Sequence, residues 1–439
     1  MTSAFRLHAS VVLPCDPTCS VLRDAVVDVT ADGRIGHVGP AVTAPPPEGP
    51  VRRLPGILLP GLVNAHAHSP MTLLRGMGGD LPLLRWLNEV IWPTEARLIP
   101  SDVRTGMVLG CVEMLKAGVT TSAEMYFHGE QVADAVLAAG SRVVLGAPVI
   151  DLPGMGMDWR AMVTAIDKWI DTDGLRFGNG DRVELAYGAH SAYMLPAEAL
   201  PLIAESANDR GALLHIHVAE SAAEDERQRA EYGSVPTMLS DLGVLGGRVL
   251  AAHAVHLSDA DIELFADNGV GVAHCPGSNA KLASGIARLA DLRAAGVPVG
   301  IGTDGPASND DLDLWEDVRL AAMLARLATG DATAVTGPEA LLMATRGGAD
   351  ALGSRTVGAL ETGRWADVVH VGVDDVAFAG GLAVPDNQLL ANLVWAAGSR
   401  SVRDVWVAGE QVLADGTATL VDEAEALAAA RVASARLRG

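Results

Sequence analysis

Histidine and carboxylate side chains end several short apolar segments of the sequence. The first segment ends in the motif HAH at residues 66–68, a later one in HIH at residues 215–217, and the last in Asp304. Residues two apart on a strand point to the same face, so His66 and His68 can direct ring nitrogens at one point. Two hydrogen-bonded histidines would explain the first motif alone. A third histidine and a carboxylate favour a metal site, because three imidazoles and one carboxylate suit zinc or iron.

The apolar segments alternate with longer stretches of helical period between about residue 57 and residue 350. Eight segments have the length and composition of strands. They cover residues 57–65, 119–127, 142–150, 183–191, 212–220, 249–257, 270–278 and 297–305. Capping residues bound the helical stretches, with Ser101 and Ser258 at N-termini and Gly118 and Gly269 at C-termini. Eight such units over roughly 290 residues predict an α/β fold with a closed (β/α)8 TIM barrel of the metallo-dependent hydrolase type.

Both ends of the chain contain short alternating segments typical of strands. We therefore expect the two termini, residues 1–56 and 355–439, to form one small composite β-sandwich, with residues 57–354 forming the catalytic barrel. The Ala-rich tail from residue 423 predicts a helix. No GxGxxG motif follows the first predicted barrel strand, so a nucleotide-cofactor site lacks its usual marker.

The charge balance argues against nucleic acid as a partner. Lys and Arg total 32 against 54 Asp and Glu, which gives a formal net charge of −22. No apolar run approaches the roughly 18 residues that span a bilayer, and the first residues lack the pattern of a secretory signal. The four cysteines have no zinc-ribbon or redox spacing. We expect a cytoplasmic protein with no membrane partner.

In barrels of this kind, function gathers at the C-terminal ends of the strands. Four segments that include such ends resemble motifs of the amidohydrolase superfamily: PGLVNAHAHSPMTLLRG, HIHVAES, HCPGSNAKLASG and GIGTDGPASND. The resemblance is to the aminohydrolase branch, in particular the methylthioadenosine and S-adenosylhomocysteine deaminases, with triazine hydrolases and guanine-type deaminases as cousins. It covers essentially the whole chain.

The resemblance implies a metal site and a catalytic shell. The implied metal ligands are His66, His68, His217 and Asp304, and the implied catalytic residues are Glu220, His253 and Asp304. Binuclear members of the superfamily bridge two ions with a carboxylated lysine at the end of the fourth strand. Residues 183–191 contain no lysine. We therefore expect one divalent transition metal per chain, zinc before iron.

The expected chemistry is hydrolytic deamination of an aminated heteroaromatic ring. A bound divalent ion lowers the pKa of its water to about 7 and so supplies hydroxide at neutral pH. Asp304 can accept the proton of that water, and Glu220 can protonate a ring nitrogen to make the adjacent carbon electrophilic. His253 can polarise or orient the attacking water, and ammonia then leaves.

A long apolar loop at residues 75–98 has the character of a substrate-binding lid. By resemblance, Trp86 packs on the substrate, although packing of the lid on the barrel is an equal alternative. Glu95 accepts hydrogen bonds from ribose hydroxyls, and pairing with Arg85 or Arg97 is the alternative for this carboxylate. His190 contacts a ring nitrogen, and Ser308 lies close to the sugar.

Recognition of an amino-acid tail is not expected. Relatives that take S-adenosylhomocysteine resemble one another in holding its carboxylate with arginines on the loop after the third strand. Residues 146–162 offer only Arg160 as a candidate. A smaller 5′-modified adenosine or a free base remains compatible with the sequence.

Three functions stay open at this point. The first is a deaminase of a purine nucleoside of the methylthioadenosine, adenosine or S-adenosylhomocysteine type. The second is a deaminase of a free guanine-like, pterin or triazine ring, and the third is a non-catalytic metal-binding protein. Glu220 argues against a non-catalytic metal-binding protein, because a carboxylic acid at this position is suited to proton transfer and not to metal coordination. Family resemblance also predicts a homo-oligomer. His215, His274 and Cys275 are expected to be structural, and His128 either lines the mouth or is solvated.

Overall fold

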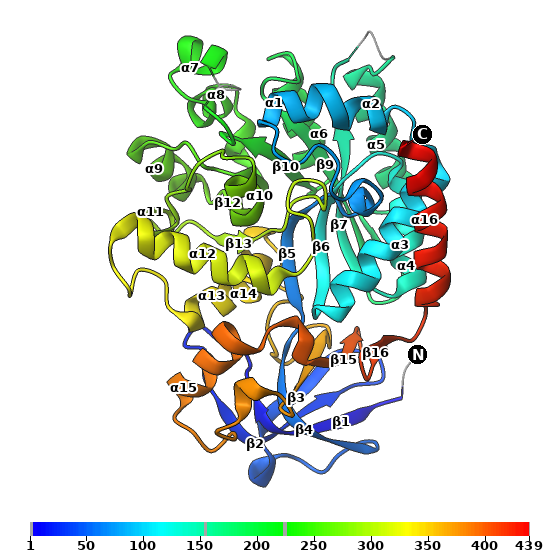
Figure 1. Ribbon diagram of the computed structural model, residues 1–439, viewed down its shortest axis with the longest axis vertical. Coiled ribbons are helices and arrows are strands. Elements are labelled where there is room, and N and C mark those ends of the chain that lie inside the picture. Colours follow the sequence, from blue (N-terminus) through cyan, green and yellow to red (C-terminus); the bar gives the residue numbers. More distant parts are fainter. Residues whose placement is uncertain (1–2, 153–155, 223–225, 439) are drawn as a thin grey trace.

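The computed structural model describes residues 3–152, 156–222 and 226–438, and it contains a barrel and a separate terminal sheet (Figure 1). Eight parallel strands follow one another in chain order around the barrel. They are β5 (Leu62–Ala67), β6 (Val119–Met125), β7 (Arg142–Val149), β9 (Val183–Ser191), β10 (Leu213–Val218), β11 (Val249–His253), β12 (Gly271–His274) and β13 (Val299–Ile301). The Asp304 amide donates to the His66 carbonyl over 3.0 Å and closes the ring between β13 and β5. The predicted TIM barrel is confirmed.

Helices surround the barrel and follow its strands. The longer ones are α3 (Pro100–Lys116), α4 (Gly129–Ala139), α5 (Trp159–Asp173), α6 (Ala199–Asp209), α9 (Asp259–Asn268), α12 (Leu314–Thr329) and α16 (Glu423–Arg438). The shorter ones are α7 (Glu226–Tyr232), α8 (Val235–Asp241), α10 (Pro276–Lys281), α11 (Leu289–Ala294), α13 (Gly337–Met343), α14 (Arg346–Ala351) and α15 (Asp386–Ala391). The predicted tail helix is α16, and it packs along α3 of the barrel.

Three of the four predicted helix-boundary residues are correct and one is wrong. Gly118 directly follows the C-cap of α3 in the left-handed conformation, with a φ of 81°. Ser258 caps α9 in a reciprocal capping box with Asp261, and Gly269 ends the helix in the left-handed conformation. Ser101 does not cap α3. That helix begins at Pro100, whose fixed φ suits the first turn, and Asp102 accepts the Ile99 amide over 2.8 Å.

The terminal sheet is built from both ends of the chain in the order β17-β16-β15-β14-β4-β1-β2-β3. Its strands are β1 (Phe5–Val12), β2 (Leu22–Val29), β3 (Ile35–Pro40), β4 (Val51–Pro60), β14 (Val368–Gly372), β15 (Val402–Val407), β16 (Glu410–Ala414) and β17 (Thr417–Ala418). The predicted strand at residues 57–65 is therefore divided between the two sheets. A Cβ on Gly61 would lie 2.0 Å from Thr120 Oγ1, so glycine allows the close crossing.

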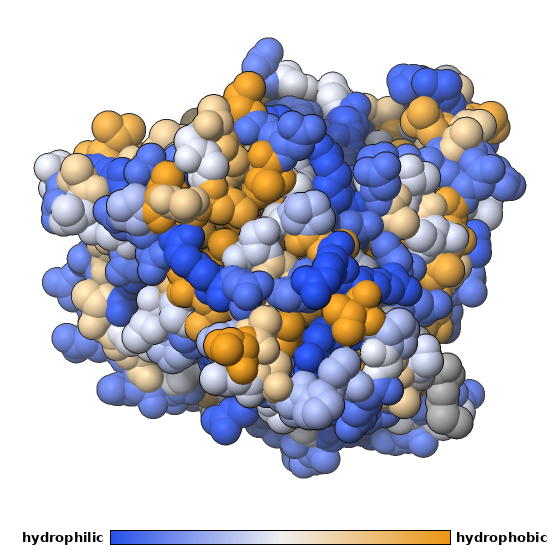
Figure 2. Space-filling model, turned by 90° about the horizontal axis from the view of Figure 1, so that it is seen from below, coloured by the Kyte–Doolittle hydropathy of each residue, from blue (hydrophilic) through white to orange (hydrophobic). Residues whose placement is uncertain are grey.

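A buried ion pair connects the terminal sheet to the bottom of the barrel. Arg142, at the start of β7, pairs with Asp367 over 2.9 Å, and both side chains are buried. Trp365 and Ala408 pack with apolar residues at this end of the strands. Figure 2 views the molecule from the terminal-sheet end and shows a largely hydrophilic face with scattered apolar side chains. The C-terminal ends of the barrel strands lie at the opposite end, where the predicted site residues are.

No helix in the described parts of the chain is long and apolar enough to cross a membrane.

Candidate active site

Three histidines meet at the C-terminal end of the barrel. His66 and His68 come from the end of β5 and His217 from β10, and one ring nitrogen of each lies within 4.8 Å of the others. Nε2 of His68 is 3.3 Å from Nε2 of His217. Asp304, after β13, places Oδ1 3.4 Å from His66 Nε2 and 3.3 Å from His68 Nε2. The structure therefore brings all four predicted ligands together.

Backbone carbonyls orient two of these rings. Met125 O accepts a hydrogen bond from His68 Nδ1 over 2.6 Å, and His190 O accepts one from His217 Nδ1 over 2.7 Å. Since Nδ1 carries the proton in both rings, each Nε2 presents a lone pair to the cluster. His66 Nδ1 lies 2.8 Å from Nε2 of buried His215, which is a hydrogen-bonded core histidine as expected.

The protonation states suit a divalent metal. Burial lowers the pKa of His66 to about 3 and that of His217 well below its usual value, so both rings are neutral. Burial alone would raise the pKa of Asp304, but the neighbouring histidines hold it well below its usual range. His66 Nε2 is buried and has no hydrogen-bond partner among the described residues. An orphaned buried nitrogen is costly unless a ligand satisfies it, and a metal ion fits this set.

Two hydroxyls hold the other oxygen of Asp304. Ser278 Oγ donates to Oδ2 over 2.6 Å, and Ser308 Oγ donates to the same oxygen over 2.9 Å. Oδ1 is thereby turned toward the histidines. Asp304 has a φ of 60°, a left-handed conformation that aspartate tolerates better than most residues. Ser308 also lines the cavity over the cluster.

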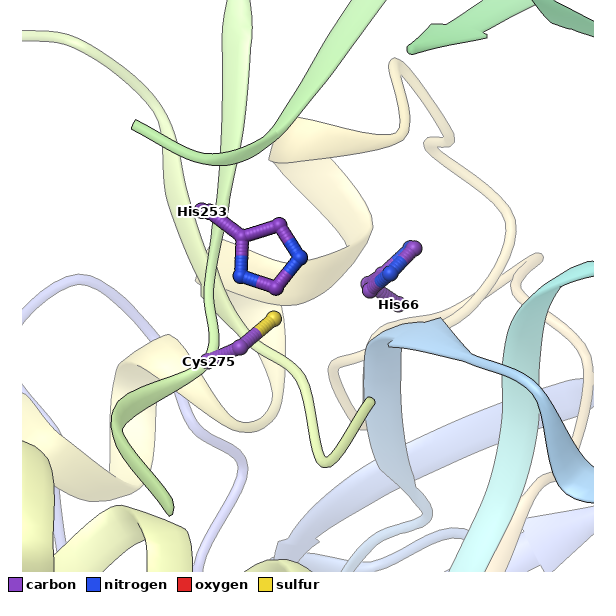
Figure 3. Close-up of side chains that lie close together, drawn as sticks. All are labelled: His66, His253 and Cys275. Carbon is purple, nitrogen blue, oxygen red and sulfur yellow. The ribbon is translucent and has the colours of Figure 1, made fainter. Parts of the chain in front are cut away.

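His253 and Glu220 lie beside the histidine cluster. His253 ends β11, and its Nδ1 is 2.9 Å from Asn279 Oδ1. Its Nε2 is 3.7 Å from Oε2 of Glu220. Figure 3 shows the ring of His253 and the thiol of Cys275 close to His66. Burial raises the pKa of the Cys275 thiol well above its usual value, which keeps it protonated and unreactive.

A cavity of about 600 Å³ opens over these groups. Among the predicted substrate contacts, Trp86, Glu95, His190 and Ser308 line it, as do Glu220, His253 and His128. Burial lowers the pKa of His190 to about 4, so this ring is neutral. The remaining wall is largely apolar and includes Leu83, Ile91, Trp92, Ile150, Met157, Met162, Ile166 and Trp169. No lysine or arginine is among the described residues that line the cavity.

Among the residues that the structure describes, Glu95 is partnered by a tyrosine and not by a lysine or arginine. Tyr126 donates its hydroxyl to Glu95 Oε1 over 2.7 Å. Arg85 pairs instead with Glu89, and Arg97 bonds to the Leu437 carbonyl. Burial raises the pKa of Glu95, and the Tyr126 hydrogen bond opposes that rise.

Arg160 is the predicted site residue that the structure does not bring to the cavity. Its side chain is 63% exposed, lies 3.7 Å from Glu198 and stacks on the Trp159 ring. Part of the loop that precedes it, residues 153–155, lies outside the described residues. Among the described residues, the cavity is therefore without the cation that Arg160 would have supplied.

Several site residues were missed by the sequence analysis. Ser278 and Asn279 lie in the motif HCPGSNAKLASG but were not among the predicted site residues, although they contact Asp304 and His253. Their position just past a strand end was the available signal. The only feature of the sequence that could have indicated Tyr126 was its position directly after β6. Glu124, fully buried on β6, accepts the Ser69 amide over 2.9 Å and so holds the turn after His68.

Comparison with known proteins agrees with this geometry. The amidohydrolase family pattern matches residues 57–412. A 5-methylthioadenosine/S-adenosylhomocysteine deaminase of Pelotomaculum thermopropionicum is 42% identical over 436 residues, 98% of each chain. A 5′-deoxyadenosine deaminase of Methanosarcina mazei is 38% identical over 97% of this chain and 96% of its own.

Solved structures give the same result. A zinc-bound adenosine deaminase from Xanthomonas campestris superposes with a TM-score of 0.90 at 36% identity, covering 100% of this chain and 99% of its own. A triazine hydrolase from Arthrobacter aurescens superposes with a TM-score of 0.89 at 25% identity, covering 98% of this chain and 99% of its own.

Proposed function

This chain belongs to the amidohydrolase family, and we propose from its site that it hydrolytically deaminates an adenine nucleoside with an uncharged 5′ group, releasing ammonia. The observation that carries the proposal is the position of Glu95. It is a carboxylate in an apolar lid, lines the same cavity as the histidine cluster, and has no lysine or arginine partner within the described parts of the chain. Vicinal hydroxyls of a ribose match such a carboxylate, which accepts hydrogen bonds.

The proposed cofactor is one zinc ion held by His66, His68, His217 and Asp304. The zinc-bound structural relative supports the identity of the metal. No lysine is on β9, where a bridging carboxylated lysine would be required for two ions. When bound, such an ion lowers the pKa of a water molecule to about 7 and supplies hydroxide at neutral pH.

The chain's own residues move the protons of the reaction. Asp304 takes a proton from the attacking water, while Ser278 and Ser308 keep Oδ2 fixed. Glu220 protonates a ring nitrogen of the base, which makes the carbon that bears the amine electrophilic. His253, held by Asn279, orients the water on the side of Glu220. Asp304 then passes its proton to the exocyclic amine, and the proton of the added hydroxyl returns to Glu220 as the ring carbonyl forms. The C–N bond to the amine breaks, and ammonia leaves.

The cavity wall accounts for the choice of 5′ group. An anionic tail that enters a partly buried site without a cation loses its hydration and gains no ion pair. The described lining offers Glu95, Glu130, Glu220 and Asp304 but no basic side chain other than histidine. The relative named a 5′-deoxyadenosine deaminase supports a nucleoside with a small, uncharged 5′ group. The relative named a 5-methylthioadenosine/S-adenosylhomocysteine deaminase supports a 5′-modified adenosine, and its name includes a substrate with an amino-acid tail.

Ammonia release from a substrate panel tests the proposal. The panel contains 5′-deoxyadenosine, methylthioadenosine, adenosine, S-adenosylhomocysteine, adenine, guanine, a pterin and an aminated triazine. We expect the three nucleosides without an amino-acid tail to have the highest kcat/KM. Preference for a free guanine-type, pterin or triazine ring would instead support the second function, a deaminase of a free ring. The structural similarity to a triazine hydrolase is the observation that favours this alternative. If the protein binds metal but releases ammonia from no compound in the panel, the third function, a non-catalytic metal-binding protein, is supported.

A further inference from the structure

The last turn of α16 is bonded to the end of the lid, residues 75–98, which contains α1 (Leu83–Trp86), η3 (Leu87–Ile91) and α2 (Trp92–Glu95). The Leu437 carbonyl accepts a hydrogen bond from Arg97 Nη2. Arg436 Nη1 donates to the Arg97 carbonyl over 3.2 Å. Figure 1 shows the C-terminal end of α16 beside α2. Residues more than 330 positions apart are therefore joined at the edge of the active site.

Arg436 also neutralises a buried carboxylate where the lid meets α3. It forms an ion pair with Asp102, whose side chain is only 7% exposed. Asp102 accepts the Ile99 amide over 2.8 Å and so caps α3. Loss of Arg436 would leave a buried, unpaired carboxylate, which favours rearrangement of this junction.

The junction is two residues from Glu95. The Arg97 amide donates to Thr94 O over 3.0 Å, and the Leu98 amide donates to Glu95 O over 2.9 Å. Residues 94–98 thus form one hydrogen-bonded turn. A shift of Arg97 is transmitted through this turn to the backbone of Glu95, whose carboxylate lines the cavity.

A second contact joins α16 to the segment after the metal-site histidines. Ser434 Oγ donates to Leu73 O over 2.8 Å. Leu73 belongs to η2 (Ser69–Leu74), which directly follows His68. Leu437 is fully buried in the same core cluster as Leu73 and Leu74. The C-terminal part of α16 therefore contacts both η2, the segment that follows His68, and the end of the lid.

We propose that Arg436 is a positioning residue for the active site: through Arg97 and Asp102, it fixes the C-terminal end of the lid and the location of Glu95 relative to the histidine cluster. The expected effect on nucleoside affinity rests on the proposed function. The effect on lid order does not. The alternative is that α16 only covers α3. In that case, substitution of any exposed residue near the end of α16 would change lid order and nucleoside affinity to the same extent.

The test compares three variants of the full-length metal-loaded protein. Arg436→Ala removes the link, and Arg436→Lys keeps a positive charge near Asp102. Arg431→Ala is the matched control, because Arg431 is exposed on the same helix and makes no side-chain hydrogen bond with a described residue. Amide hydrogen exchange of residues 87–98 reports lid order, and steady-state kinetics with 5′-deoxyadenosine and adenine report the site.

In Arg436→Ala, we expect faster exchange at residues 87–98 and a KM for 5′-deoxyadenosine raised about tenfold, the size of effect typical of lost charge-assisted hydrogen bonds. We expect kcat to stay within about twofold, since the proton-transfer groups are untouched, and kcat/KM for adenine to be unchanged. Arg436→Lys should recover part of the KM effect, and Arg431→Ala should match the wild type.

The outcomes separate the two proposals. Unchanged exchange at residues 87–98 in Arg436→Ala, or an equal change in Arg431→Ala, overturns the positioning role. Amide exchange at residues 87–98 could be faster in Arg436→Ala alone while the wild-type protein deaminates no nucleoside. That result supports the positioning role of Arg436 and rejects the proposed substrate. Equal losses of kcat for nucleoside and adenine would assign Arg436 to general stability and also overturn the inference.

Discussion

Tyr126 donates a 2.7 Å hydrogen bond to Glu95 and so ties the lid to the residue that follows barrel strand β6. Burial raises the pKa of the Tyr126 hydroxyl well above its usual value, so the phenol stays protonated and remains the donor. This contact aligns Oε1 of Glu95. The carboxylate retains acceptor capacity for a ligand, because an ionised carboxylate has about four lone-pair sites.

Glu95→Ala should remove most of the preference for nucleosides over free adenine. We expect kcat/KM for 5′-deoxyadenosine to fall by about 10- to 150-fold, equivalent to the 1.5–3 kcal/mol of hydrogen bonds to a charged group. Adenine, which has no sugar, should be unaffected. Glu89→Ala is the control, since Glu89 is an exposed lid carboxylate paired with Arg85. An unchanged ratio of nucleoside to adenine kcat/KM would remove Glu95 from sugar recognition.

Tyr126→Phe should have a smaller effect in the same direction. The carboxylate stays in place but loses the donor that aligns it, so we expect KM for 5′-deoxyadenosine to rise several-fold, corresponding to about 1 kcal/mol for one hydrogen bond. The double variant with Glu95→Ala should be no worse than Glu95→Ala alone, because both act on one interaction. Additive losses would indicate a separate role for Tyr126.

Glu220→Gln should abolish most of the activity without loss of the metal. General acid-base groups contribute about 10²- to 10⁴-fold, and Gln keeps the size of the side chain but cannot deliver the proton. Metal content by elemental analysis should remain at the wild-type level. More than about a tenth of wild-type turnover would contradict the role of Glu220 as a proton shuttle.

Asp304→Asn should lower both turnover and metal affinity while the barrel stays folded. The substitution removes the proton acceptor and weakens a ligand, and the backbone bond to His66 is unaffected. Ser278→Ala should retain more activity and weaken metal binding about 10- to 100-fold, as is usual for partners that orient a ligand. Metal titration of the apo-protein separates the two variants. Unchanged metal affinity in Asp304→Asn would exclude Asp304 as a ligand.

The purified protein should contain close to one equivalent of a divalent metal. Chelation should abolish deamination, and one equivalent of zinc should restore it. The apo-protein should also melt at a lower temperature than the metal-loaded form, because an ion bound only by the folded state stabilises that state. Two firmly bound ions per chain would contradict the mononuclear site.

The barrel was predictable because its strands are apolar on both faces and its helices carry their own boundaries. The division of residues 57–65 between two strands was not predictable, because the apolar run is continuous in sequence. The need for glycine at position 61 becomes visible only from its close approach to Thr120 in the structure. The first-turn signals at α3 were present, but Pro100 and Asp102 outweigh Ser101. The side on which α16 packs depends on tertiary contacts that no local pattern encodes.

The predicted ligands lie together because closure of a parallel barrel brings the strand ends to one rim. His66, His217 and Asp304 were recognisable as metal-binding types at those ends. The partner of Glu95 was not predictable, because Arg85 and Arg97 are neighbours in sequence whereas Tyr126 reaches it only through docking of the lid. Ser278 and Asn279 were visible as polar residues after a strand, but their contacts with Asp304 and His253 depend on how α10 turns over the rim.

β4 pairs with β14, a strand that is synthesised much later, so one edge of β4 stays unpaired for part of the synthesis of the chain. β4 ends at Pro60 and β14 begins at Val368, so roughly 300 residues emerge between two neighbouring strands. At about 5–20 residues per second, one edge of the N-terminal half-sheet waits about 15–60 s for its partner. During that interval it is an unpaired template for strands of other chains. The nascent protein is therefore most exposed to aggregation while the barrel is being made, from the completion of β4 until β14 leaves the ribosome.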